Sequence, residues 1–241
     1  MTERIAKASP RVRARMAGLF YLIAAQAYAF AEFSVRGKLV VNGDAASTAH
    51  NILAHESLYR LGFAAELIST VFFIMVTLLF YDLFKPVNRR ISLLAAVFSL
   101  IGCAIQALSS LLHLAPLVVL GGEPFLRAFK VEQLQSLALL FLMLRTQATN
   151  IYMVFFGCYN LLLGYLIFRS TFLPRILGVF MAIAGLTYQV FLSPPLATYL
   201  FPYVLAPAGA LGELSLVLWL LVMGVNVQKW KERASAEGML T

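Results

Sequence analysis

The sequence predicts an all-α protein, a polytopic transmembrane helical bundle with about six spans that forms a single transmembrane domain over residues 1–241. Three observations lead to this fold class. Hydrophobic residues make up 61% of the 241 residues and charged residues only 12%, whereas soluble domains are about half apolar and a quarter charged. The apolar residues form runs as long as a membrane-spanning helix, about 20 residues. These runs are continuous, which excludes the alternating strands of a transmembrane β-barrel.

Six stretches of the sequence have the length and composition of a membrane-spanning helix. They lie near residues 16–40, 61–84, 91–119, 149–168, 172–192 and 203–227. Pro174 suits the first turn of the fifth helix, because a proline lacks the amide hydrogen that is unused there. The sequence Ser193-Pro194-Pro195 ends that helix.

The first stretch also has features of a secretory signal peptide. A basic start precedes an apolar run that contains the small residues Ala27, Ala29 and Ala31. The run is long for the hydrophobic region of a signal peptide, and no clear mature domain follows it. We therefore expect an uncleaved first helix, with cleavage, which leaves five spans, as the alternative.

Two outer loops are expected to carry short helices. A Gly-Asp turn at 43–44 is followed by a predicted helix over residues 45–59, with Ser47 or Thr48 as its cap. A Gly-Gly-Glu-Pro sequence ends the third span, and the residues after it, 131–145, form an amphipathic pattern. We predict that this segment is a helix lying along the outer interface of the membrane.

The distribution of Lys and Arg predicts the orientation. With the N-terminus inside, thirteen of these residues fall on the inner side, and six fall outside: Arg36, Lys38, Arg60, Arg127, Lys130 and Arg145. Positive residues are enriched in cytoplasmic loops, so both termini are placed in the cytoplasm. The net charge of +8 is then explained by topology and by anionic lipid headgroups, and we expect no nucleic-acid partner.

Glycines recur at two-turn intervals in the fourth and fifth predicted helices. Gly157 and Gly164 are seven residues apart, as are Gly178 and Gly185. Small residues on one helix face allow neighbouring helices to approach closely in lipid. The spacing predicts a close helix–helix contact.

Polar side chains of the third helix share one face. Gln106, Ser109, Ser110 and His113 stand at i, i+3, i+4 and i+7, the spacing of one helical surface. They lie in the half of this helix nearer the outside, whereas the inner halves of the spans are almost wholly apolar. This depth pattern predicts a polar pocket that opens outward and is sealed inward.

Two carboxylates are the strongest candidates for other walls of this pocket. Glu66 lies in the second helix and Glu213 near the middle of the sixth. A charge at the bilayer centre costs about 3 kcal/mol, so such residues face the bundle interior and are candidate functional residues. The alternative is that these groups only bond one another or reach the interface, which we favour for Glu32 because Arg36 lies one turn on.

No motif specifies a chemistry. Haem needs two histidines on facing helices, and only His113 lies in a span. Glu66, Glu213 and His113 are a conceivable metal set without diagnostic spacing, and Ser109 or Ser110 beside His113 is a weak hydrolase pattern. Nucleophile elbows, His-Glu-x-x-His and Gly-rich nucleotide loops are missing from the sequence. We expect neither a metal nor a cofactor, and the question of enzymatic activity stays open.

Several runs resemble a bacterial membrane family, domain of unknown function 4386. They include RMAGLFYLI from Arg15, GDAASTA from Gly43, LYRLGF from Leu58, FLPRILG from Phe172 and GELSLVLWLL from Gly212. The resemblance covers nearly the whole chain and implies one helical membrane domain, without a known activity. Arg60 and Glu213 match family runs, which supports both as site candidates. Where the family pattern has histidine before and within the fourth helix, this chain has Arg145 and Tyr159.

The sequence thus predicts a multi-pass protein of the bacterial cytoplasmic membrane that binds or transports a small or amphiphilic ligand. The alternatives are an intramembrane enzyme and a non-catalytic scaffold. Membrane lipids are expected partners, and a homo-oligomer is left open. The predicted ligand-binding residues are Glu213, Glu66, His113, Gln106 and Ser110, with Arg60 at the mouth of the pocket.

Overall fold

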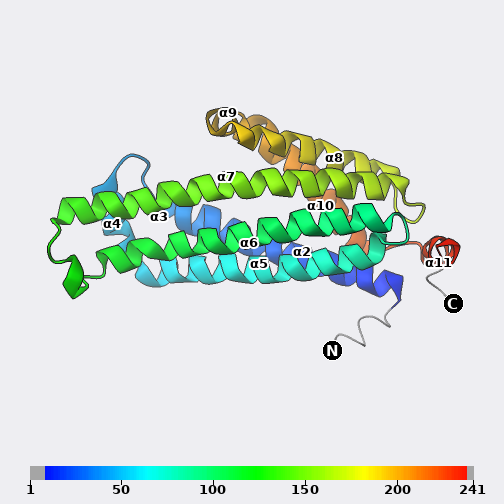
Figure 1. The fold of residues 1–241 in the computed structure, drawn as a ribbon, viewed down its shortest axis with the longest axis horizontal. Coiled ribbons are helices and arrows are strands. Elements are labelled where there is room, and N and C mark those ends of the chain that lie inside the picture. Colours follow the sequence, from blue (N-terminus) through cyan, green and yellow to red (C-terminus); the bar gives the residue numbers. More distant parts are fainter. Residues whose placement is uncertain (1–8, 238–241) are drawn as a thin grey trace. The chain divides into compact units, whose positions relative to one another are not determined.

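A computed structural model describes residues 9–237, and every regular element in that range is helical (Figure 1). Six helical segments are long and apolar enough to cross a membrane, as the sequence predicts. They are α2 (Pro10–Ala29) with η1 (Phe30–Arg36) and α3 (Gly37–Leu39); α5 (Glu56–Phe84); α6 (Arg89–Leu120); α7 (Val131–Arg169); α8 (Arg175–Tyr188) with η3 (Gln189–Leu192); and α9 (Pro194–Leu200) with η4 (Phe201–Leu205) and α10 (Ala206–Val222). The shorter elements are α4 (Ala45–Ala54), η2 (Pro124–Leu126) and α11 (Val227–Ala236).

Helix α7 differs from the sequence prediction. The expected interfacial helix at 131–145 and the expected span at 149–168 are one continuous helix of 39 residues (Figure 1). The reason is local, because residues 131–156 contain neither proline nor glycine, the residues that interrupt helices most strongly. The amphipathic pattern of residues 131–145 therefore belongs to the first turns of a long helix.

Asp44, rather than Ser47 or Thr48, caps α4. Its carboxylate accepts hydrogen bonds from the Ser47 amide at 2.9 Å and from the Ser47 hydroxyl at 2.6 Å. Thr48 instead bonds the backbone of Val41, which ties the helix to the preceding turn. The expected single helix over 45–59 is divided, since α4 ends at Ala54 and α5 begins at Glu56.

The Asp44 cap predicts a pH dependence of α4. The two bonds from Ser47 hold the pKa of Asp44 below its ordinary value, so the cap stabilises the helix above the unfolded pKa, and this is lost as pH falls through the lowered value. We expect hydrogen exchange at the Ser47 amide, corrected for its intrinsic pH dependence, to lose protection on acidification through that range. The Asp44→Ala variant should show weak protection at every pH, and a variant with the wild-type profile would contradict this role.

The chain divides into two compact units. Of the described residues, the first comprises 9–22, 72–103 and 150–237, and the second comprises 23–71 and 104–149. Helices α2, α5, α6 and α7 therefore contribute residues to both. The second unit has a core of six buried residues: Val35, Leu39, Ile52, Tyr59, Leu117 and Leu142.

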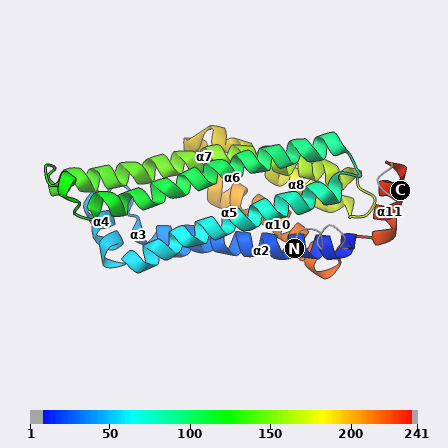
Figure 2. The same ribbon diagram turned by 60° about the horizontal axis from the view of Figure 1, so that its bottom comes forward.

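In the first unit, α8 lies against the C-terminal part of α7, as Figures 1 and 2 both show. The contact is made through the four predicted glycines. A Cβ atom built on Gly164 lies 2.7 Å from the Gly178 carbonyl oxygen, and one built on Gly185 lies 2.7 Å from the Gly157 carbonyl oxygen. The predicted close approach is confirmed, because there is no room between the two backbones for a side chain.

Candidate functional site

Four ionisable side chains from four helical segments meet inside the second unit. Glu32 lies on η1, Glu66 on α5, His113 on α6 and Arg145 on α7. The Arg145 guanidinium donates through Nη2 to carboxylate oxygens of both Glu32 and Glu66. Glu66 is 0% exposed, and Arg145 and His113 are each 1% exposed. These four residues are called the charged cluster below.

Both ring nitrogens of His113 have hydrogen-bond partners. Its Nδ1 lies 3.0 Å from Glu66 Oε1, and its Nε2 lies 3.1 Å from the backbone carbonyl oxygen of Tyr59. A carbonyl oxygen only accepts, so Nε2 donates to Tyr59, and Nδ1 shares a hydrogen bond with the Glu66 carboxyl. The charged cluster thus sets two basic side chains, Arg145 and His113, against two acidic ones, the pairing that buried ionisable groups require.

Two further side chains hold these charges in place. Ser110 donates to Glu66 Oε2 at 2.9 Å, so that both oxygens of this carboxylate are engaged. The Tyr59 hydroxyl donates to the His113 carbonyl oxygen at 2.6 Å, and the two rings stack with their centroids 4.3 Å apart. Glu32 has a second, longer contact with the half-exposed Arg36 at 3.7 Å.

Gln106 lies beside this network with its whole side-chain amide unsatisfied. It is 4% exposed, and neither its side-chain nitrogen nor its side-chain oxygen has a hydrogen-bond partner. It stands one turn before Ser110 on the helix face that also carries His113. A buried amide without partners is destabilising, so this position has unused capacity to bind a polar group.

Arg60 lies at the surface of the second unit. It pairs with Glu56 at 2.7 Å and lines a hollow of about 390 Å³. The other lining residues are Leu53, Glu56, Leu114, Leu117, Val118, Gly121 and Glu123. Tyr59, the residue before Arg60, is bonded to His113, so neighbouring residues of α5 contact the hollow and the charged cluster.

Glu213 belongs to the first unit. It lies on α10 and accepts a hydrogen bond from the Tyr188 hydroxyl at 2.7 Å. Of the six predicted ligand-binding residues, the structure thus joins Glu66, His113 and Ser110 directly, with Gln106 on the same face of α6. Arg60 and Glu213 have other partners.

Sequence reasoning missed Arg145 and gave Glu32 only a structural role. Arg145 was placed in an outer loop segment, whereas it lies within α7 and is buried. One signal was available, because an arginine in an uninterrupted apolar run needs a buried carboxylate nearby. The sequence does not show which carboxylate, since Glu32 and Glu66 are 113 and 79 residues away.

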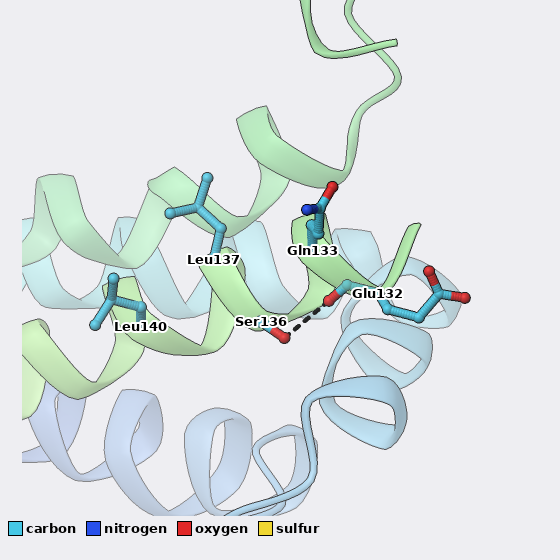
Figure 3. Close-up of a pocket in the computed structure, with 5 residues that line it drawn as sticks. All are labelled: Glu132, Gln133, Ser136, Leu137 and Leu140. Atoms are coloured by element: carbon cyan, nitrogen blue, oxygen red, sulfur yellow. Dashed lines mark hydrogen bonds between the residues drawn. The ribbon is translucent and has the colours of Figure 1, made fainter. Parts of the chain in front are cut away.

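A metal centre and a second surface hollow are the other candidate sites, and neither is supported as a functional site. Among residues 9–237, no group of three or more His, Cys, Asp and Glu side chains is placed to hold a metal ion. A hollow on the first turns of α7 is lined by Glu132, Gln133, Ser136, Leu137 and Leu140 (Figure 3). It contains none of the predicted site residues, and its polar Ser136 hydroxyl donates to the Glu132 carbonyl oxygen of the same helix.

Comparison with known proteins gives a family but no activity. No curated protein and no solved structure matches the chain. Residues 16–224 match the family described as "Domain of unknown function (DUF4386)". That match includes all six candidate spans, apart from residues 10–15 at the start of α2, and every residue of the charged cluster. The chain therefore belongs to the DUF4386 family.

Proposed function

We propose that this chain is a multi-pass protein of the bacterial cytoplasmic membrane that binds or transports a small or amphiphilic ligand through its second unit. Both termini lie in the cytoplasm in this proposal. The burial of Arg145 removes one positive residue from the predicted outer loops, so the excess of Lys and Arg on the inner side becomes larger.

The charged cluster carries the proposal. Buried ion pairs add little to stability compared with apolar residues of the same size, because desolvation offsets their attraction. Four ionisable groups within apolar helices are therefore poorly explained by folding alone. In membrane proteins such groups mark the paths and sites of polar ligands.

The hollow at Arg60 supplies an approach to this cluster. Leu53, Leu114 and Leu117 give it an apolar side, and Arg60 and Glu56 give it charges. A ligand with a polar head and an apolar part matches these walls. Tyr59 precedes Arg60 and His113 precedes Leu114, so both are sequence neighbours of residues that line the hollow. Tyr59 and His113 are also hydrogen-bonded to each other, so displacement of Tyr59 would expose His113 to the ligand.

An intramembrane hydrolase is less well supported. The Ser110 hydroxyl donates to the Glu66 carboxylate, and both ring nitrogens of His113 are engaged with Glu66 and Tyr59. A serine nucleophile needs a base that accepts its proton. Both ring nitrogens of His113 are already engaged, so the serine–histidine pair of a hydrolase is not formed and the arrangement favours binding over hydrolysis.

Gln106 provides the test. We expect native mass spectrometry of the detergent-purified chain to detect a bound small molecule, and the Gln106→Leu variant to lose most of it. The same variant should be as stable as the wild type or more stable by up to about 1 kcal/mol, because it removes an unsatisfied buried amide. Thermal unfolding in the same detergent measures this.

The exposed Gln133 offers a matched control. Gln133→Leu makes the same chemical change at the surface and should leave the bound molecule in place. Equal retention of the molecule by both variants, or a wild-type protein that carries no small molecule after purification in mild detergent, would contradict the proposal.

A further inference from the structure

A second polar site lies within the first unit, around the Glu213 carboxyl. The Tyr188 hydroxyl of α8 donates to Glu213 Oε1 of α10 at 2.7 Å. Gly209, one turn earlier on α10, makes this contact possible, because a Cβ atom built there lies 2.1 Å from the Tyr188 hydroxyl oxygen. Any other residue at 209 would displace the hydroxyl.

This site has more polar capacity than its own side chains use. Tyr21 of α2 and Asn160 of α7 also face the Glu213 carboxyl. Asn160 is 0% exposed, and its amide oxygen has no hydrogen-bond partner; its amide nitrogen and the buried Tyr21 hydroxyl face the Glu213 carboxyl and bond no other group. Within residues 9–237, no Lys, Arg or His forms an ion pair with Glu213. The partly buried carboxyl therefore has no positively charged partner among these residues.

Aromatic rings form the rest of the surroundings. Tyr21 packs edge-on against Phe73 with ring centroids 5.2 Å apart. Phe156 lies 5.3 Å from Phe73 and 5.7 Å from Tyr188. The two tyrosines that face Glu213 are thus joined through two phenylalanines into one cluster of rings, within a single unit of the chain.

We propose that the Glu213 site binds an organic cation, a protonated amine or a quaternary ammonium ion. A carboxylate attracts such a cation, and aromatic faces bind it through their negative quadrupole. The unpartnered Asn160 amide oxygen and the oxygen of the Tyr21 hydroxyl can accept from an N–H or hydroxyl group of the ligand. The rings offer few ligands to a metal ion, which binds best to several oxygens or nitrogens, and the carboxylate repels anions.

This inference goes beyond the proposed function. It rests on Glu213, Tyr188, Tyr21 and Asn160 of the first unit, none of which belongs to the charged cluster or to the hollow at Arg60. Either site can therefore fail its test without affecting the other.

Titration calorimetry of the full detergent-purified chain tests the charge requirement. The two probes are choline and 3,3-dimethyl-1-butanol, which have nearly the same shape, but only choline is positively charged. We expect choline to bind at least about tenfold more tightly than the neutral alcohol, a difference of one charge-assisted contact. Equal affinities, or no heat of binding from choline up to millimolar concentrations, would overturn the proposal.

Two variants test whether choline binds at Glu213. Glu213→Gln keeps an acceptor for Tyr188 but removes the negative charge, and we expect it to weaken choline binding by about tenfold or more. Glu132→Gln makes the same change on an exposed turn of α7 and should bind choline like the wild type. Equal choline affinities of these two variants would place the cation elsewhere and refute the site. If Glu213→Gln does not fold, the comparison of the two probes on the unaltered chain still decides.

Discussion

Replacing Arg145 by leucine should destabilise the folded protein by about 3 kcal/mol, the low end of the range for breaking a buried ion pair. Arg145 is the residue that donates to both Glu32 and Glu66. Without it, Glu66 keeps His113 and Glu32 keeps only the longer contact with Arg36 at 3.7 Å. Chemical unfolding in detergent micelles measures the free-energy change.

Lys85 provides the matched control for Arg145. It pairs with Asp82 at 2.6 Å, but both side chains are about one-third exposed, and exposed ion pairs contribute about 0–1 kcal/mol. Lys85→Leu should therefore have a small effect. If Arg145→Leu were no more destabilising than Lys85→Leu, the charged cluster would not hold the charges described above.

A triple variant separates charge from packing at Arg145. Arg145→Leu combined with Glu32→Gln and Glu66→Gln removes both carboxylates that lose Arg145 as a partner and should recover much of the lost stability, because neutral replacements of buried ion networks are often tolerated. Failure of the triple variant to improve on Arg145→Leu would show that the loss comes from the shape of the arginine side chain.

Substituting alanine for Gly178 should destabilise the contact between α7 and α8 by about 1–3 kcal/mol, the usual effect of overpacking. The added Cβ would lie 2.6 Å from the Gly164 carbonyl oxygen and 2.7 Å from the Phe168 amide nitrogen. Both are backbone atoms of α7, so the helices must separate. A Cβ atom added at Gly164 would lie 2.7 Å from the Gly178 carbonyl oxygen, so Gly164→Ala should destabilise the contact by a similar amount.

Gly102→Ala is the control for this substitution. Its nearest neighbour is a ring carbon of Tyr152 at 3.3 Å, a side-chain atom that can shift by a few tenths of an ångström. Alanine is favoured over glycine in a helix by about 1 kcal/mol, so Gly102→Ala should be neutral or stabilising. Equal thermal stability of Gly102→Ala and Gly178→Ala would contradict the close packing of the two backbones.

The candidate sites were only partly predictable. The spacing of Ser110 and His113 places them on one face of α6. Their partner is Glu66, a buried carboxylate in another span. The sequence also placed Glu213 in that pocket, but its hydrogen-bond partner is Tyr188 of α8. Helical periodicity shows which residues of one helix share a face, but not which helix that face meets.

The number of spans, their helical state and the glycine faces of α7 and α8 could all be predicted from the residues alone. These follow from local causes, because apolar length, the absence of helix breakers and residue spacing act within one segment. The burial of Arg145 between Glu32 and Glu66, and the contact of Glu213 with Tyr188, became visible only in the folded chain. Those pairings depend on the rotation of each helix about its axis, which is set by the packing of residues distant in the chain.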